Sequence, residues 1–231
     1  MSSSDNVRVD EEADDGLSPK ARRTRELLIG AARTVFARDG FLDARISDIA
    51  TEAGVAHGTF YTYFDSKEAV FREVMVRLFD ELREDPAVSP YHSDEPLERI
   101  EHANRRFIDV YRRNARLIAT VEQVVTFSDD IRALRRELRN PWVQRNIRSI
   151  QRWQAAGIAD PELDPEYAAA ALQAMVDRFA YVWVVLGYDF DEDRAVRTLT
   201  RMWALALGMQ APPSTRALAK KAGRRKAASK G

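Results

Sequence analysis

The sequence contains no cysteine and only three histidines. Without cysteine, disulfides, thiol nucleophiles and thiolate metal sites are excluded, and the composition fits a reducing cytoplasm. His57, His92 and His102 are too few and too scattered for an ordinary histidine-based metal site. No uninterrupted apolar run reaches the roughly 18–20 residues that a transmembrane helix needs, and the acidic start is unlike a signal peptide. We therefore expect a cytoplasmic protein with no membrane, metal or cofactor partner.

Sequence signatures of catalysis are missing as well. The chain has no glycine-rich phosphate loop, no nucleophile elbow and no pair of carboxylates at an identifiable spacing. We therefore assign no catalytic residue, and an enzyme is the least favoured class of protein.

The formal net charge is zero, but the charge is distributed unevenly. Residues 1–19 carry six acidic residues and one arginine, a balance of −5, whereas residues 212–231 carry seven basic residues and no acidic one. The electric field that a nucleic acid meets is local, so overall neutrality does not argue against DNA binding.

The most informative stretch is Ile46 to Lys67, ISDIATEAGVAHGTFYTYFDSK. It predicts a short helix, a turn at Gly54, a second short helix from His57 to Phe64, and the start of a third helix. Glycine tolerates the left-handed backbone that ends a helix abruptly. Helix, short glycine turn and helix form a helix-turn-helix motif, whose second helix enters the major groove of DNA.

The predicted second helix divides into two faces at 100° per residue. Phe60 and Phe64 share the face that should anchor it to the core. The other side carries residues suited to close approach and hydroxyl contacts, namely Gly58, Thr59, Thr62 and Tyr63, with Tyr61 at the flank. A purely aromatic core segment is the alternative, but two opposite faces of so short a helix cannot both be buried.

The string AGVAHGTFYTYFDSKEAV resembles the recognition segment of TetR-family transcriptional regulators. Gly54, Gly58, Tyr61, Phe64 and Lys67 all fall in register with that family's pattern, and the strong match covers roughly residues 20–75. The resemblance implies that both short helices begin with a capping Ser or Thr. This chain departs from it with Arg45 and Ala56, and loss of a cap costs about 1 kcal/mol.

The resemblance also places the DNA contacts. Those nearest the bases would be Ser47, His57, Gly58 and Thr59. The helix before the motif starts at Ser18-Pro19, with Ser as cap and Pro at the first position, and carries the basic residues Lys20, Arg22, Arg23 and Arg25 in its first turns, beside the DNA. An ordinary solvated surface is the alternative for those basic residues. Phosphate and backbone contacts are expected from Lys20, Arg22, Arg23, Arg45, Tyr61, Thr62, Tyr63 and Lys67, the last at a helix start with capping-box spacing from Asp65 to Glu68.

Helical periodicity continues through the rest of the chain, with no strand pattern. We predict an all-α protein of about nine helices, in which the helix 67–84 links the DNA-binding head to the body and Pro141 kinks or splits a long helix. The predicted organisation is a disordered acidic extension (1–18), a three-helix DNA-binding domain (19–65), a helical ligand-binding and dimerisation domain (66–210), and a disordered basic tail (211–231).

The last two helices, from about 166 to 186 and 191 to 209, each have a continuous apolar stripe. The resemblance implies that they pair with those of a second copy in a four-helix dimer bundle; internal core helices are the alternative. Arg178 lies in an otherwise apolar stretch, where Glu122, an anionic ligand or a surface position would satisfy it.

The body has more aromatic residues than a small helical bundle requires, which fits either a plain core or an apolar effector pocket. The resemblance favours the pocket. Our candidates for lining it or orienting a ligand are Phe107, Tyr111, Glu122, Trp142, Asn146, Phe179 and Trp183.

The sequence thus predicts a ligand-responsive homodimeric regulator, most simply a repressor, that binds a pseudo-palindromic double-stranded operator and is released by a largely apolar small molecule. Two alternatives stay open: a DNA-associated architectural protein without sequence preference, and a small-molecule-binding helical protein with a vestigial helix-turn-helix. The sequence identifies neither the effector nor the operator.

Overall fold

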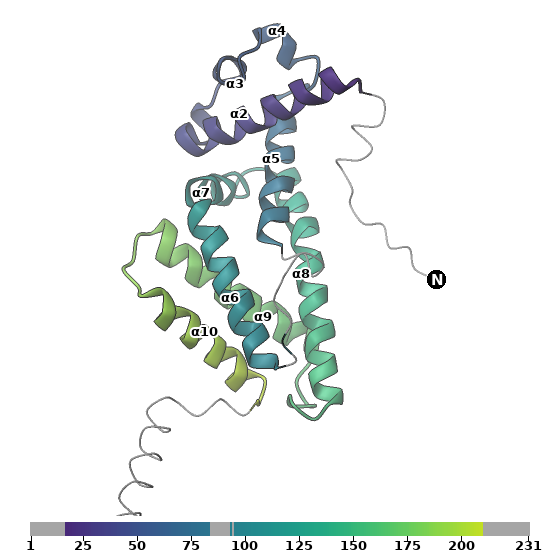
Figure 1. Ribbon diagram of the computed structural model, residues 1–231, viewed down its shortest axis with the longest axis vertical. Coiled ribbons are helices and arrows are strands. Elements are labelled where there is room, and N and C mark those ends of the chain that lie inside the picture. Colours follow the sequence, from purple (N-terminus) through teal and green to yellow (C-terminus); the bar gives the residue numbers. More distant parts are fainter. Residues whose placement is uncertain (1–16, 84–92, 94, 210–231) are drawn as a thin grey trace, which may run out of the picture. The chain divides into compact units, whose positions relative to one another are not determined.

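The structure, a computed structural model, describes residues 17–83, 93 and 95–209 (Figure 1). All regular structure in these residues is helical, in nine α-helices and one π-helical segment, which confirms the predicted fold class. The acidic extension, except for its last two residues, and the basic tail lie outside the described residues, as does most of the predicted loop 85–96.

The described residues form two compact units. Unit 1 contains residues 17–83 and 110–139, and unit 2 contains 93, 95–109 and 140–209. Helices α6 (Pro96–Arg113) and α8 (Asp129–Ala155) each contribute residues to both units. Unit 1 thus combines the N-terminal helices with elements farther along the chain.

Unit 1 is built around α2, which packs against α3, α5 and α7. Its helices are α2 (Pro19–Asp43), α3 (Ile46–Glu52), α4 (His57–Phe60), α5 (Lys67–Leu82) and α7 (Ala115–Val124). Phe36 and Phe41 of α2 pack on Phe71 of α5 with ring centroids 5.0 and 4.9 Å apart. The Thr120 hydroxyl of α7 donates to the Phe36 carbonyl at 3.1 Å, so α7 is joined to the same core.

Local sequence signals explain where these helices begin and end. The Ser18 hydroxyl accepts from the Ala21 amide, and Pro19 occupies the first helical position, as predicted. Gly40 interrupts α2 with φ 75°, although helical turns continue to Asp43. At α5 the cap is Ser66, which accepts from the Ala69 amide, rather than Asp65 as the capping-box spacing suggested.

Unit 2 has its own hydrophobic core. It is formed by the first part of α6, the second half of α8, α9 (Pro165–Ala180), the π-helical segment η1 (Tyr181–Val185) and α10 (Glu192–Ala206). A buried hydrogen bond from the Asn104 amide to the Thr200 hydroxyl, 3.3 Å long, joins α6 to α10. Arg105 adds an ion pair to Asp193 at 2.7 Å on the surface of the same helices.

Two helices differ from the sequence prediction. Of the two alternatives predicted at Pro141, a kink or a split, the split does not occur: α8 is a single helix with buried side chains on both sides of the proline, among them Leu134, Trp142 and Ile150. The helix predicted to run to Leu186 changes to π geometry at Tyr181 before Gly187 ends it with φ 78°.

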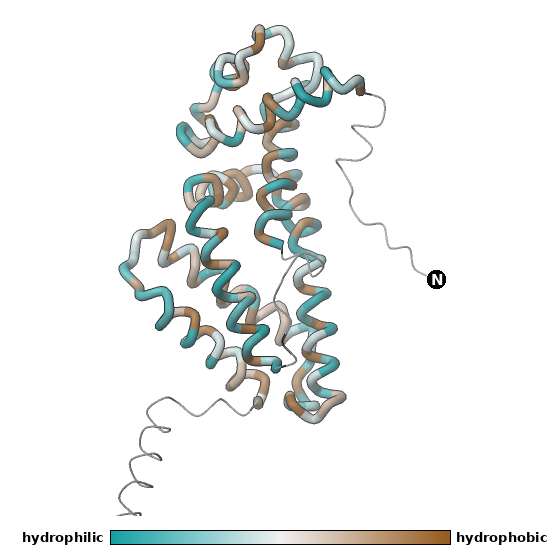
Figure 2. The backbone as a smooth tube through the Cα atoms, in the orientation of Figure 1, coloured by the Kyte–Doolittle hydropathy of each residue, from teal (hydrophilic) through white to brown (hydrophobic). Residues whose placement is uncertain are grey.

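The segment Pro165–Val185 is long and apolar enough, by length and composition alone, to cross a membrane. Figure 2 shows its pale and brown colours beside the more hydrophilic α6. The segment is not an uninterrupted apolar run, because it contains Asp177 and Arg178. Core and interface helices of soluble proteins pass the same test, so the finding indicates an apolar helix that is only 28% buried within this chain.

Candidate DNA-binding surface and effector region

The recognition segment has the predicted helix-turn-helix form. Helix α3 ends at Glu52 with Ala53 as its C-cap, and Gly54 adopts φ 67°, where a side chain would be strained. Helix α4 is shorter than predicted, because the backbone tightens after Phe60: the Thr62 and Tyr63 amides donate to carbonyls three residues back. Figure 1 shows α3 and α4 together on one side of α2.

The two predicted faces of this segment separate by burial. Phe60 is completely buried and Phe64 nearly so, with their rings 5.7 Å apart. His57, Gly58, Tyr61 and Thr62 are exposed, whereas Thr59 and Tyr63 are partly buried. A Cβ added at Gly58 would meet nothing within 4 Å, so the protein itself does not require glycine there. A small exposed helix face held by buried phenylalanines suits close approach to a DNA groove.

The first residues of both short helices lack side-chain caps, as the sequence indicated. Neither Arg45 nor Ala56 makes a capping hydrogen bond from its side chain. The Arg45 carbonyl accepts from the Asp48 and Ile49 amides, as the first carbonyl of a helix does. The unsatisfied amides at the starts of α3 and α4 are therefore open to water or to phosphate oxygens.

A group of exposed basic residues lies at the start of α2. Lys20, Arg22 and Arg23 are exposed and form no ion pair with any other residue that the structure describes. The first turn of α2 contains no acidic residue, and the helix dipole disfavours cations at that end. These basic side chains are thus available to an external anion. Arg45 and Ser47, also exposed, lie at the start of α3.

Lys67 has a role other than the predicted phosphate contact. Its ammonium donates to the carbonyls of Phe41, Leu42 and Ala44, at 2.6, 3.3 and 2.9 Å, and lies 4.6 Å from the Phe41 ring centroid. All three donors are therefore used to bind the unsatisfied carbonyls at the end of α2. The structure replaces the phosphate-binding prediction for Lys67 with a structural one.

Three Arg–Glu pairs join α2 to α5 at successive turns of α5. Arg25 binds Glu73 at 2.8 Å, with both residues more than 90% buried. Arg77 binds Glu26 in two hydrogen bonds, and Arg33 binds Glu81 in two more. The Arg77 guanidinium lowers the pKa of Glu26 by hydrogen bonding. Helices α2 and α5 are therefore held together along their contact.

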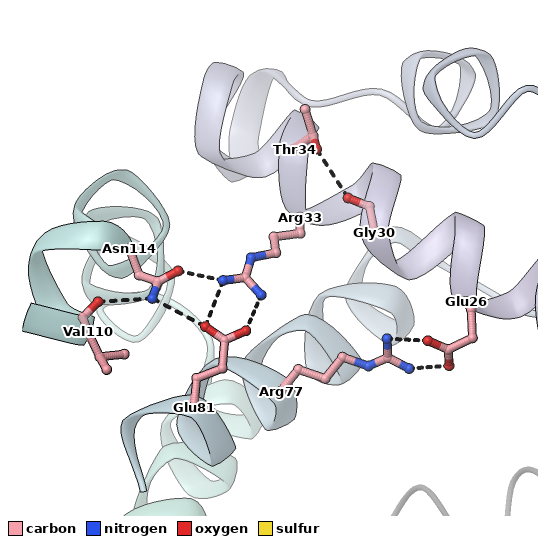
Figure 3. Close-up of polar contacts among 8 residues, drawn as sticks. All are labelled: Glu26, Gly30, Arg33, Thr34, Arg77, Glu81, Val110 and Asn114. Carbon is pink, nitrogen blue, oxygen red and sulfur yellow. Dashed lines mark hydrogen bonds and ion pairs between the residues drawn. The ribbon is translucent and has the colours of Figure 1, made fainter. Parts of the chain in front are cut away.

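The third of these pairs extends to the junction between α6 and α7 (Figure 3). Arg33 also donates to the side-chain oxygen of Asn114, whose amide nitrogen donates to Glu81 at 3.3 Å and to the Val110 carbonyl at 2.9 Å. Hydrogen bonding to Arg33 lowers the pKa of Glu81. The Arg33–Glu81–Asn114 cluster thus connects α2, α5 and the start of α7 within unit 1. We did not predict it, because its members are 33 to 81 residues apart in the sequence.

The residues predicted to bind an effector are divided between the two units. Unit 2 contains two aromatic pairs, Phe107 with Trp142 at 6.3 Å and Phe179 with Trp183 at 6.0 Å, and an Asn146–Gln173 hydrogen bond. Tyr111 is buried in unit 1, where the Glu122 carboxylate pairs with Arg135. Glu122 therefore has an ion-pair partner within its own unit. Arg178 lies at the surface, 4.6 Å over the Tyr181 ring.

The aromatic residue that we missed is Phe190. Its ring stacks on Phe179 at 5.1 Å and lies 6.2 Å from Trp183, which places it beside η1. It stands in the acidic segment GYDFDED, between the last two predicted helices. No group of three or more potential metal-ligating side chains occurs in the part of the chain that the structure describes.

Comparisons with known proteins agree with this arrangement. The family model described as "Bacterial regulatory proteins, tetR family" matches residues 28–74, and that described as "Transcriptional regulator EthR, C-terminal domain" matches residues 100–207. The HTH-type transcriptional repressor KstR2 of Mycolicibacterium smegmatis is 32% identical over 163 residues, covering 66% of this chain and 75% of the relative. The regulator YdgC of Bacillus subtilis is 37% identical over 67 residues, which span 29% of this chain and 34% of YdgC.

The fold is shared with solved regulators. The crystal structure of FadR from Bacillus subtilis in complex with stearoyl-CoA has a TM-score of 0.65 at 22% identity, covering 80% of this chain and 99% of that one. Fold and recognition segment together define a helix-turn-helix transcriptional regulator. The chain belongs to the TetR family.

Proposed function

We propose that this regulator is a homodimeric repressor, which binds a pseudo-palindromic operator in the cytoplasm and is released from it by a small molecule. The observation that carries this proposal is the exposed face of α4. His57, Gly58, Tyr61 and Thr62 are free at the surface, while Phe60 and Phe64 fix the segment to the core. Ser47 and Thr59 complete the surface that would lie nearest the bases, and Tyr63, Lys20, Arg22, Arg23 and Arg45 would contact the backbone.

Dimerisation through α9 and α10 is supported by apolar side chains that nothing in the described chain covers. On α9, Tyr167 is 76% exposed and is followed on the same face by Ala170, Ala171 and Ala174. On α10, Leu205 is 60% exposed beside Met202. Exposed apolar surface of this kind marks an interface, and a second copy of the same chain is the occupant that we propose.

The effector that we propose is largely apolar or amphipathic and binds in unit 2. The aromatic pairs Phe107–Trp142 and Phe179–Trp183 would supply apolar contacts, and Asn146 a polar one. The related fold of FadR was solved with stearoyl-CoA, whose acyl chain belongs to this chemical class. Tyr111 stays a weaker candidate because it is part of unit 1.

In the mechanism that we propose, the effector favours a conformation in which α5 is displaced. Because three Arg–Glu pairs join α5 to α2, such a displacement carries the helix-turn-helix with it. The distance between the two recognition helices of the dimer then no longer matches the operator. The shift is limited by the difference in the effector's affinity for the two conformations.

Selection of bound DNA from a random duplex library tests this proposal. We expect enrichment of one pseudo-palindromic sequence, and loss of binding to it when an effector is added. Tight binding without an enriched sequence would favour the architectural alternative, and ligand binding without any DNA binding would favour a vestigial motif. Native mass spectrometry of the purified protein would identify a co-purified ligand.

A further inference from the structure

The bases at the start of α2 are next in the chain to an acidic segment. Lys20, Arg22 and Arg23 are exposed, have no ion-pair partner among the described residues, and lie where the helix dipole disfavours them. Residues 5–15 contain six acidic residues and one arginine, and five of the six lie between Asp10 and Asp15. An anion at this end of α2 would be stabilised both by the three bases and by the helix dipole.

The acidic segment is close enough to reach these bases. Seven residue steps separate Asp10 from Leu17, and a fully extended chain covers at most about 25 Å over that length. A segment tethered this closely has an effective concentration on the order of millimolar. It therefore meets the three bases at a concentration that free DNA seldom reaches.

We propose that the acidic segment 5–15 is an intramolecular competitor of DNA, which occupies the basic surface formed by Lys20, Arg22 and Arg23 when no DNA is bound. This inference rests on the proposed use of that surface for phosphate contacts. A specific operator displaces the segment because it also makes base contacts through α4. Random DNA relies on phosphate contacts alone and must displace the same segment, so the segment lowers the affinity for non-specific DNA.

The competitor has a measurable effect on salt dependence. Each base that neutralises a phosphate contributes about 0.9 to the slope of log affinity against log salt. When the acidic segment already occupies the three basic residues, DNA binding exchanges one anion for another. The contribution of these residues to the salt slope is then lost. A chain without the acidic charges should have a slope steeper by up to about 2.7, which changes the affinity ratio by up to about 40-fold between 50 and 200 mM salt.

The experiment compares full-length chains that differ only in charge. The neutralised chain carries Asp5→Asn, Asp10→Asn, Glu11→Gln, Glu12→Gln, Asp14→Asn and Asp15→Asn. The matched control keeps every residue of the segment 5–15 in shuffled order. Binding of a fluorescent random-sequence duplex is measured by anisotropy between about 50 and 200 mM salt. We expect the neutralised chain to bind more tightly and with a steeper slope, and the shuffled chain to match the unaltered protein.

A second set of variants locates the effect. Lys20→Gln, Arg22→Gln and Arg23→Gln are combined in both the unaltered and the neutralised chain. If the acidic segment acts on these bases, neutralising it has little effect once they are gone. A full effect that persists would overturn the proposal, because the acidic residues would then act on another surface, such as the basic tail. Tighter binding by the shuffled chain would also overturn it.

The same variants separate this inference from the proposed DNA-binding surface. In the neutralised chain, the triple substitution must weaken random DNA binding and flatten the salt slope; if it does not, the start of α2 is not a DNA surface. If it does, but the neutralised and unaltered chains bind random DNA equally, the DNA surface stands and the competitor is refuted.

Discussion

The buried Arg25–Glu73 pair should be essential to the stability of unit 1, whereas its exposed neighbour on the same two helices should not. Arg25 and Glu73 are 6% and 8% exposed. Arg25→Met leaves a buried carboxylate without its guanidinium, and breaking a buried pair in this way costs about 3–5 kcal/mol. For a chain of this size, each kcal/mol lowers Tm by about 2–4 °C. We therefore expect a loss of about 6–20 °C.

The matched control is Arg77→Met, which breaks the pair to Glu26 one turn farther along α5. The side chains of Arg77 and Glu26 are 29% and 52% exposed, so this pair should contribute at most about 1 kcal/mol and about 4 °C. Replacing both buried partners, Arg25→Met with Glu73→Leu, should recover most of the stability because no buried charge remains. Thermal and urea denaturation followed by circular dichroism measure all four proteins. Equal losses for Arg25→Met and Arg77→Met would refute the reasoning.

Three further predictions concern other sites. Lys67→Met should destabilise the protein by about 1.5–3 kcal/mol because the hydrogen bonds to three carbonyls are lost, yet it should leave the salt slope of DNA binding unchanged. A slope reduced by about 0.9 would show that Lys67 does contact a phosphate. Because Arg33 lowers the folded-state pKa of Glu81, that carboxylate stabilises the protein above its unfolded pKa, and the contribution is lost as pH falls through the folded pKa. Denaturation of Glu81→Gln should therefore depend less on acid than that of the unaltered protein, and equal pH profiles would contradict this. Leu205→Glu should give monomers in light scattering, whereas Ile158→Glu, at another exposed apolar position, should not; dimers of both would exclude the α9–α10 interface.

The recognition segment could be predicted in detail because its information is local. The positive φ of Gly54, the burial of Phe60 and Phe64 and the missing caps at Arg45 and Ala56 all follow from residues a few positions apart. The start of α2 at Ser18 follows from similar short-range rules.

Contacts between distant segments could not be predicted in the same way. Lys67 stands at a helix start, where a lysine can bind phosphate. Only the fold shows that its ammonium donates to three carbonyls at the end of α2. Likewise, nothing in the sequence around Glu122 identifies Arg135 as its partner, and the ring of Phe190 reaches Phe179 because Gly187 and η1 redirect the chain. The role of such residues depends on tertiary contacts that occupy their hydrogen-bond donors or bury their side chains, and the local sequence does not show these contacts.

The contacts within unit 1 limit how α5 can move in response to an effector. The helix-turn-helix shares a core with other helices, since α2 is joined to α5 by three ion pairs and to α7 by Thr120. An effector response that moved α5 alone would have to break these contacts. Movement of α5 together with the helix-turn-helix preserves them and is therefore the less costly change.

The most direct test of the DNA-binding surface is a pair of glycine substitutions. Gly58 on α4 and Gly30 on α2 are both exposed, and an added Cβ would meet nothing within 4 Å at either position. Leucine should therefore stabilise both helices, by up to about 1 kcal/mol each. We predict that Gly58→Leu abolishes binding to the selected operator while Gly30→Leu leaves it unchanged, as measured by anisotropy titration. Equal operator affinity for the two variants would contradict the assignment of α4 as the recognition helix.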